Sequence, residues 1–123
     1  MKKILITEDS ATMRSLLVST IEALDDYEIV EACSGFDALR LLPREKVDLI
    51  ITDINMPDIN GLELISYVRN NPNYKDIPLF IVSTEGSEKD LEKGLALGAN
   101  EYLVKPFDPI NLQKLIQQYL GAD

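Results

Sequence analysis

The residues whose types and positions most clearly suggest a chemical role are three acids that follow apolar segments. Glu8 and Asp9 stand just after the apolar run 4–6, and Asp53 ends the apolar run 47–52. Three carboxylates brought to one place repel one another, which destabilises a fold unless a cation is bound between them. Carboxylate oxygens, a backbone carbonyl and water are ligands that Mg²⁺ accepts in octahedral geometry. If the fold brings these acids together, they support a divalent metal site.

A lysine and a hydroxyl extend this chemistry to phosphoryl groups. Lys105 supplies a point charge and Thr84 a hydroxyl donor, and both suit phosphoryl oxygens. The chain contains no His, and Thr84 has no neighbouring base, so the nucleophile must be a carboxylate. An aspartate such as Asp53 can attack phosphorus to form an acyl phosphate, provided that the metal and Lys105 offset the negative charges. These residue types indicate phosphoryl transfer to an aspartate.

Length, charge and composition exclude several other classes of protein. With 123 residues the chain has the size of one domain, spanning 1–123. Its net charge of −9 disfavours direct binding to nucleic acid, which requires a basic face. No apolar run approaches the ~20 residues of a membrane span, and the N-terminus turns acidic too early for a signal peptide. The single Cys33 fits a reducing cytoplasm, and we expect it to be a small buried side chain.

Strand-like and helix-like segments alternate five times along the chain. Strands are predicted at Ile4–Ile6, Tyr27–Ala32, Val47–Thr52, Pro78–Ser83 and Glu101–Val104. Apolar residues at helical spacing predict helices over residues 13–24, 35–42, 62–68, 88–97 and 112–120. Apolar strands separated by helices favour a parallel sheet covered on both faces. We therefore predict an α/β fold, a three-layer doubly wound (βα)5 domain with a five-stranded parallel sheet.

The acids, the lysine and the hydroxyl all follow predicted strands, and ligands of open parallel sheets bind outside the carboxyl ends of the strands. Asp9 alone would be interpreted as a helix cap and Asp53 as a turn former. Thr84 alone would be interpreted as a cap of the next helix and Lys105 as a solvated charge. Their convergence at one edge favours a common site. Asp58 lies in an evident turn and is interpreted as a turn residue only.

Four motifs spread over the whole chain carry a family resemblance. They are LITEDSATMR, DLIITDINMPDINGLEL, PLFIVSTEG and GLALGANEYLVKPF, in that order. Together they resemble the receiver domain of bacterial two-component response regulators, especially the stand-alone CheY type. The resemblance implies the strand order 2-1-3-4-5, for which CheY itself is a standard example. It also implies a regulatory domain and not an enzyme, with Mg²⁺-dependent self-phosphorylation and autodephosphorylation as its only reactions.

The resemblance assigns roles to the acidic residues. Asp53 matches the phosphoacceptor, which takes a phosphoryl group from a phosphohistidine of a sensor histidine kinase or of a His-phosphotransfer protein. Asp9, Asp53 and the main-chain carbonyl of Asn55 match the ligands of Mg²⁺. Glu8 matches an acid that acts on the metal through water.

Further residues match the parts that respond to phosphorylation. Thr84 matches the switch hydroxyl, Tyr102 an aromatic that swings inward behind it, and Lys105 the lysine of the site. The peptide bond from Lys105 to Pro106 matches one that is cis in the family. Glu85 departs from the family, which carries a small residue directly after the switch hydroxyl. We expect Glu85 and Asn55 to alter the rates of phosphorylation and of water attack.

Phosphorylation in this family biases a two-state equilibrium and alters a distant binding face. The resemblance places that face on the fourth helix, fifth strand and fifth helix. Its residues include Lys89, Glu92, Lys93, Tyr102 and the outer side of Leu112–Tyr119. Because three residues follow the last helix, we expect a single receiver domain without an output domain, acting on another protein. We expect a monomer, and dimerisation on phosphorylation stays open.

Two other classes compete with this interpretation. A haloacid-dehalogenase-like phosphatase also places a nucleophilic aspartate after an apolar strand, but it needs a second aspartate two residues later. Asn55 occupies that position and cannot act as a general acid or base. A flavodoxin-like electron carrier is disfavoured because no loop rich in Ser, Thr and Gly follows the first strand. Mass spectrometry after exposure to a small phosphodonor discriminates the switch from the phosphatase.

Overall fold

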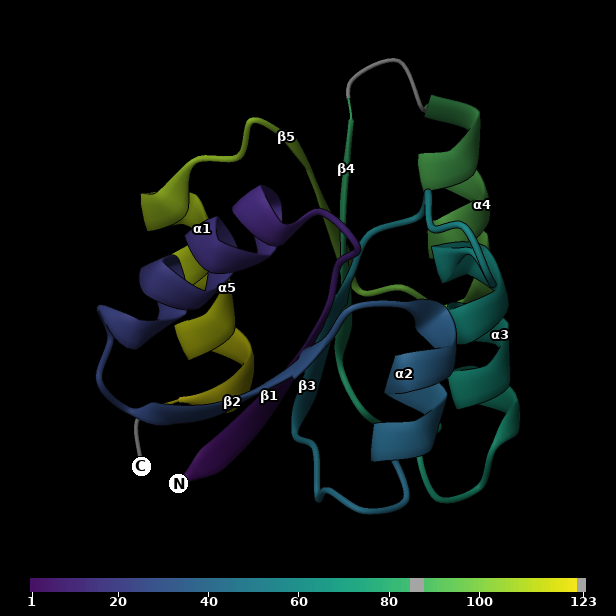
Figure 1. Ribbon diagram of the computed structural model, residues 1–123, viewed down its shortest axis with the longest axis horizontal. Helices are drawn as coiled ribbons and strands as arrows, with labels where there is room; N and C mark the ends of the chain where they lie inside the picture. The colour runs from purple at the N-terminus through teal and green to yellow at the C-terminus, as the bar shows by residue number, and fades with distance from the viewer. Residues whose placement is uncertain (85–87, 122–123) are drawn as a thin grey trace.

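Five strands and five helices alternate along the chain in a computed structural model that describes residues 1–84 and 88–121 (Figure 1). The strands are β1 (Lys2–Thr7), β2 (Tyr27–Ala32), β3 (Leu49–Thr52), β4 (Leu79–Thr84) and β5 (Glu101–Lys105). The helices are α1 (Ala11–Glu22), α2 (Gly35–Leu41), α3 (Gly61–Asn70), α4 (Glu88–Leu97) and α5 (Pro109–Leu120). Each element overlaps the segment where the hydrophobic periodicity predicts it, although several bounds differ by two or three residues.

The strands form one parallel sheet in the order β2-β1-β3-β4-β5, which confirms the predicted fold class and strand order. Helices α1 and α5 cover one face, and α2, α3 and α4 cover the other (Figure 1). All four residues of β3 are buried, because this central strand has helices on both sides. Two apolar clusters, one on each face of the sheet, make up the core.

Short polar side chains begin most of the helices. Ser10 accepts a hydrogen bond from the amide of Met13 at the start of α1, and Asp108 does the same for Ile110 before α5. Pro109 occupies the first turn of α5, as predicted. At the other end of a helix, Gly98 has φ of 122°, a left-handed conformation that follows α4 and favours glycine.

The structure corrects two expectations. Strand β3 begins at Leu49 and not at Val47, because the chain at Asp48 bends to exchange hydrogen bonds with Lys3 on the neighbouring strand, at 2.8 Å in each direction. Val47 is still buried, so its apolar character reflects the core and not a strand. Cys33 is exposed and not buried. It lies after the end of β2, where the amide of Cys33 bonds to Asp37 and no pleat turns the side chain inward.

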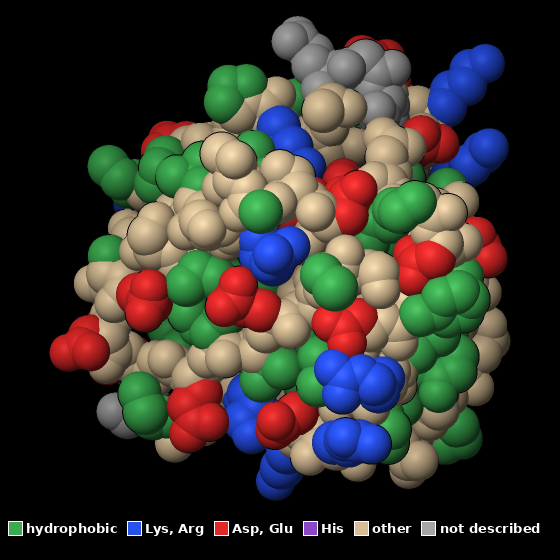
Figure 2. All heavy atoms as spheres, in the orientation of Figure 1, with side chains coloured by type: hydrophobic (Ala, Val, Ile, Leu, Met, Phe, Trp, Pro, Cys, Tyr) green, Lys and Arg blue, Asp and Glu red, His purple; other side chains and the backbone are tan. Residues whose placement is uncertain are grey.

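None of the helices within 1–84 and 88–121 is long and apolar enough to cross a membrane. The acidic and basic side chains on the face shown in Figure 2 are scattered among one another, and Lys and Arg do not gather into one patch there.

Candidate phosphoryl-transfer site

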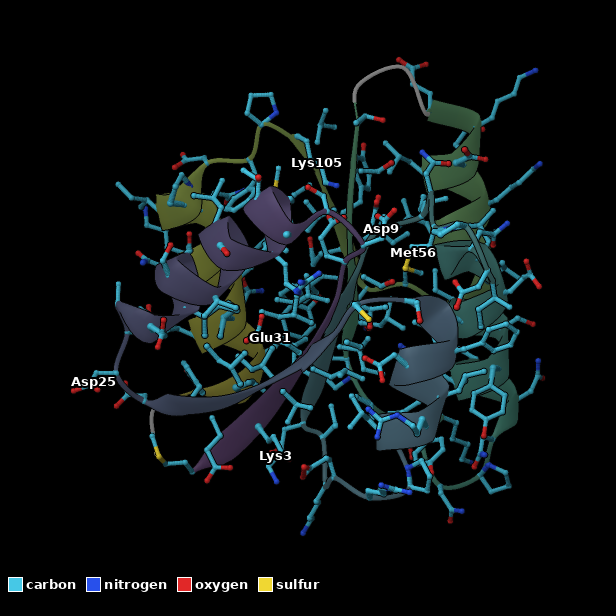
Figure 3. The ribbon with its side chains drawn as sticks, in the orientation of Figure 1. Lys3, Asp9, Asp25, Glu31, Met56 and Lys105 are labelled. Carbon is cyan, nitrogen blue, oxygen red and sulfur yellow. The ribbon has the colours of Figure 1, made fainter. Side chains whose placement is uncertain are left out.

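Three acids meet at the carboxyl edge of the sheet. Glu8 follows β1, Asp9 is the next residue, and Asp53 follows β3. One carboxylate oxygen from each lies within 4.8 Å of the others. Glu8 and Asp53 are buried, with Asp53 only 6% exposed, whereas Asp9 is exposed at the rim. Figure 3 shows Asp9 and Lys105 at the same edge of the sheet.

The backbone continues the sheet ladder as far as these acids. The amide of Glu8 donates to the carbonyl of Ala32 at 3.1 Å, and the amide of Asp53 donates to the carbonyl of Thr7 at 3.0 Å. Glu8 and Asp53 are therefore each the first residue beyond a strand, but each is still hydrogen-bonded to the neighbouring strand. Strand pairing therefore fixes the backbone positions of these two residues, from which their carboxylates extend.

Lys105 lies between two of the acids. Its Nζ atom is 2.6 Å from Oε1 of Glu8 and 3.4 Å from Oδ2 of Asp53. The lysine side chain is only 11% exposed. A single cation thus faces two buried carboxylates, and the acid cluster keeps an excess of negative charge.

Burial raises the pKa of Glu8, whereas the hydrogen bonds from Lys105 and from the amide of Ser10 act against that rise. The amide of Ser10 lies 3.1 Å from Oε2 of Glu8. Asp53 receives a hydrogen bond at Oδ1 from the amide of Ile54 at 2.8 Å, while its Oδ2 faces Lys105. Both carboxylates are thereby oriented by groups of the chain itself.

The donor set fits a hard divalent cation. Glu8, Asp9 and Asp53 offer oxygen atoms only, close enough for one ion to be shared. No thiolate or imidazole belongs to the cluster, which disfavours the softer transition metals. Asn55 lies two residues after Asp53, and its side chain is exposed. Three of the four residues predicted to bind Mg²⁺, namely Glu8, Asp9 and Asp53, are thus brought to one edge.

Glycine permits the tight turn that follows Asp53. A Cβ atom on Gly61 would overlap the carbonyl oxygen of Asp53 and lie 2.8 Å from the Cα of Ile54. The amide of Gly61 closes the loop by donating to the carbonyl of Ile54 at 2.8 Å. Asn60 and Glu63 then start α3 with a capping box. The Asn-Gly pair acts as a helix entry, as the sequence predicts.

The end of β4 carries two adjacent hydroxyls. Thr84 is paired with Lys105 in the register of β4 and β5, and Thr84 is exposed. Ser83 is fully buried, and its Oγ atom has no hydrogen-bond partner among the described residues. Such an unpaired buried hydroxyl is uncommon. Ser83 is therefore a second candidate for the hydroxyl of the site, beside Thr84, which the family resemblance predicts.

Two further predicted residues, Tyr102 and Pro106, lie on β5 and directly after it. Tyr102 is 45% exposed on β5 and borders a surface hollow beside α4, lined also by Glu88, Leu91, Glu92 and Leu95. The bond from Lys105 to Pro106 is cis, the geometry that the family resemblance implies. Glu85 lies outside the described residues.

Asp58 does more than shape a turn. Its two carboxylate oxygens accept hydrogen bonds from the amides of Gly35 at 3.2 Å and Phe36 at 2.8 Å, in the first turn of α2. The bond from Phe36 makes the largest contribution to a lowering of the pKa of Asp58 to about 2. No local pattern could have revealed this contact, because its partners are more than twenty residues away along the chain.

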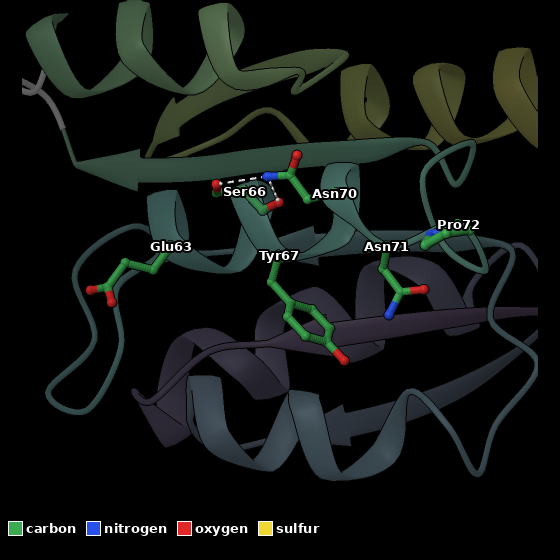
Figure 4. A pocket seen from close by; sticks show the side chains of 6 residues that line it. All are labelled: Glu63, Ser66, Tyr67, Asn70, Asn71 and Pro72. Atoms are coloured by element: carbon green, nitrogen blue, oxygen red, sulfur yellow. Dashed lines mark hydrogen bonds between the residues drawn. The ribbon is translucent and has the colours of Figure 1, made fainter.

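A separate hollow is formed by α3 and the residues that follow it, and none of Glu8, Asp9 and Asp53 lines it (Figure 4). It is lined by Glu63, Ser66, Tyr67, Asn70, Asn71 and Pro72. Within it, Nδ2 of Asn70 donates to the carbonyl of Ser66 at 2.8 Å. Its lining contains one carboxylate and no basic side chain, so it lacks the charge arrangement of the sheet-edge site.

Comparisons with known proteins agree with the site. Residues 4–117 match the family model of the response regulator receiver domain. A chemotaxis protein CheY homolog of Campylobacter jejuni is 41% identical over 121 residues, covering 98% of this chain and 93% of that protein. The chemotaxis response regulator CheY4 of Vibrio cholerae superposes with a TM-score of 0.87 at 37% identity, covering 98% of this chain and 99% of that one.

A third relative is the receiver domain of the sensor histidine kinase PA1611 of Pseudomonas aeruginosa. Its structure has a TM-score of 0.88 and 26% identity, covers 98% of both chains, and holds a magnesium ion coordinated in its active-site cleft. The family match extends over almost the whole chain, and the described fold and acid cluster agree with it. This chain therefore belongs to the response regulator receiver domain family and is CheY-like.

Proposed function

We propose that this protein is a phosphorylation-dependent signalling switch in which Asp53 accepts the phosphoryl group. The observation that carries the proposal is the cluster of Glu8, Asp9 and Asp53 with Lys105 between two of its members. The phosphodonor is the phosphohistidine of a sensor histidine kinase or of a His-phosphotransfer protein. We expect the protein to act in the cytoplasm and to be a monomer in its unphosphorylated form.

The metal proposed for the site is Mg²⁺. Asp9, Asp53 and the main-chain carbonyl of Asn55 would hold it, and Glu8 would act through a water molecule. When bound, the ion supplies positive charge that offsets the repulsion between the carboxylates and the phosphoryl oxygens. The oxygen-only donor set of the three acids supports this choice.

In the transfer step an oxygen of Asp53 forms a bond to phosphorus as the phosphorus–nitrogen bond of the donor breaks. The other ring nitrogen of the donor carries a proton, so the imidazole keeps the electron pair of the broken bond and leaves as a neutral ring. Lys105 lies 3.4 Å from Oδ2 of Asp53 and stabilises the negative charge that collects on the oxygens. Its contact with Glu8 at 2.6 Å holds the ammonium group in place.

The hydroxyl that responds to the phosphoryl group comes from the end of β4. The family resemblance predicts Thr84 for this role. Ser83 competes with it, because its buried hydroxyl has no partner in the described structure and a phosphoryl oxygen would supply one. The two variants Ser83→Ala and Thr84→Ala decide between them. The variant that is still phosphorylated but no longer changes its partner binding identifies the switch hydroxyl.

The proposed output surface consists of α4, β5 and α5. Lys89, Glu92 and Lys93 are exposed on α4, and Tyr102 is half-exposed on the adjoining strand. Phosphorylation would alter this surface and so change its affinity for a downstream protein. Scattered basic side chains and a net charge of −9 favour a protein partner over nucleic acid.

Incubation with Mg²⁺ and acetyl phosphate tests the proposal. Intact mass should show one phosphoryl group that is stable in acid and labile in base, and Asp53→Asn should abolish it. Asp53→Asn that labels as well as the wild type would contradict the assignment of the acceptor. Catalytic turnover of several phosphomonoesters would instead favour the phosphatase class, which Asn55 disfavours because an amide cannot act as general acid or base.

A further inference from the structure

The loop between β3 and α3, residues 53–60, carries both the proposed phosphoacceptor and the proposed carbonyl ligand. Its start is held by the ladder bond from Asp53 to Thr7, and its end is closed by the bond from Gly61 to Ile54. Ile54 and Met56 are buried, whereas Asn55, Pro57 and Asp58 are exposed. The outer half of the loop therefore needs an anchor beyond its own ends.

Asp58 supplies that anchor through α2. Oδ1 of Asp58 accepts from the amide of Gly35 at 3.2 Å, and Oδ2 accepts from the amide of Phe36 at 2.8 Å. These two amides belong to the first turn of the helix, where no intrahelical acceptor exists. A carboxylate is favoured there by the helix dipole as well as by the hydrogen bonds.

A second observation shows that the loop is seated closely on the same helix end. A Cβ atom on Gly35 would overlap Cγ1 of Ile59 and lie 2.8 Å from the carbonyl oxygen of Ile59. Glycine is thus required where the residue after Asp58 contacts the helix. The hydrogen bonds and the packing act on neighbouring residues of the loop, so they fix its position together.

We propose that Asp58 is a positioning residue for the metal site: by tying the β3–α3 loop to the start of α2, it holds the main-chain carbonyl of Asn55 where it can bind Mg²⁺. Asp58 itself does not touch the metal or the phosphoryl group. The inference rests on the proposed function, because Asn55 acts as a ligand only if the acid cluster binds Mg²⁺.

A titration of Mg²⁺ into the full-length protein, followed by amide chemical shifts or calorimetry, tests this role. Asp58→Ala should raise the Kd for Mg²⁺ by about tenfold, the usual effect of removing a group that orients a ligand. Asp58→Asn should raise it less, because one amide oxygen can still accept from Phe36. Acetyl phosphate labelling of Asp58→Ala should be slow at low Mg²⁺ and approach the wild-type rate at saturating Mg²⁺.

Asp37→Ala is the matched control, because it removes an acid from the first turn of the same helix. The carboxylate of Asp37 accepts from the amide of Cys33 at 3.1 Å and pairs with Arg40 at 2.6 Å. Its loss should lower Tm but leave the Kd for Mg²⁺ unchanged. The inference is overturned if Asp58→Ala binds Mg²⁺ as tightly as the wild type, or if Asp37→Ala weakens binding equally. It is also overturned if the effect of Asp58→Ala disappears at high salt, because screening removes a charge effect and leaves an anchoring effect.

Hydrogen exchange in the metal-free protein separates this inference from the proposed function. The amide of Gly61, bonded to Ile54, should exchange faster in Asp58→Ala than in the wild type or in Asp37→Ala. Wild-type protein that binds no Mg²⁺ and accepts no phosphoryl group would contradict the proposed function, whereas the exchange data would still report the anchor. Unchanged exchange at Gly61 in Asp58→Ala would contradict the anchor itself.

Discussion

Nζ of Lys105 lies 2.6 Å from Oε1 of Glu8, although the two residues are 97 positions apart in the chain. The contact joins an edge strand, β5, to the strand next to the opposite edge, β1. The contact spans the carboxyl edge of the sheet past the end of β3, which Asp53 directly follows. Glu8 and Asp53 therefore share one buried cation, and the charge balance of the whole site depends on it.

Replacing Lys105 should lower the free energy of unfolding, and Mg²⁺ should restore part of the lost stability. Lys105→Met leaves two buried carboxylates without their cation, which costs on the order of 3 kcal/mol in metal-free buffer. Urea unfolding measures this loss, and a repeat with saturating Mg²⁺ should show a smaller one, because the ion replaces part of the missing charge. An equal loss in both buffers would mean that the acids do not share a metal site.

Removing Asp9 should have opposite effects with and without the metal. Without Mg²⁺, Asp9→Asn should raise the free energy of unfolding, because it relieves repulsion from Glu8 and Asp53. With Mg²⁺ at 100 times its Kd, the wild type should gain about 2.7 kcal/mol, and the variant should gain much less. Thermal unfolding with added Mg²⁺ or chelator gives both values. If Asp9→Asn gains as much stability from Mg²⁺ as the wild type does, Asp9 is not a ligand of the metal.

Lowering the pH should remove the stabilisation that Asp58 provides. The pKa of Asp58 is about 2 in the folded protein, below its ordinary value of 3.8, so the carboxylate stabilises the fold fully above about pH 4. Protonation between about pH 4 and 2 removes that stabilisation. The difference in Tm between the wild type and Asp58→Asn should be constant from pH 7 to 5 and shrink below pH 4. A difference that does not change down to pH 3 would contradict the charged contact with α2.

Arg69 should be among the most important polar side chains for stability. It donates to the carbonyls of Gly98, Lys75 and Ile77 and to Oδ1 of Asn100. These bonds join α3 to the segment before β4 and to the turn between α4 and β5. Arg69→Met should cost on the order of 3 kcal/mol in urea unfolding, because partly buried carbonyls lose their donors.

Arg40→Met is the control for that prediction. Arg40 pairs with Asp37 at 2.6 Å, but its side chain is 54% exposed, so its loss should cost less than about 1 kcal/mol. Comparable losses in the free energy of unfolding for the two variants would show that the four hydrogen bonds of Arg69 do not stabilise the fold more than an exposed ion pair does.

The sequence was sufficient for the fold class because the strands are apolar on both faces and the helices have a clear period. It also placed Glu8, Asp53 and Lys105 at one edge, since the carboxyl ends of parallel strands meet there. The strand order depended on the family resemblance. The sequence could not show which acid contacts Lys105. That contact depends on how far the lysine side chain extends along the sheet edge, which is determined only once the strands are paired.

Other features escaped prediction because they depend on contacts distant in the chain. Asp58 has the local pattern of a turn residue, and its partners on α2 are identified only once the loop packs there. Cys33 was expected to be buried from its residue type alone, but it follows the end of its strand and is exposed. Ser83 and Thr84 are equivalent as hydroxyls in sequence, and only burial distinguishes them.

The most direct test of the account is the site of phosphorylation. Wild-type protein, Asp53→Asn and Asp25→Asn are incubated with Mg²⁺ and acetyl phosphate, and intact mass and peptide mapping locate the phosphoryl group. Asp25 is exposed, tolerates Asn because its φ is 59°, and lies far from Asp9 in Figure 3. The account predicts one base-labile phosphoryl group on Asp53 in the wild type and in Asp25→Asn, and none in Asp53→Asn. Equal labelling of Asp53→Asn would contradict it.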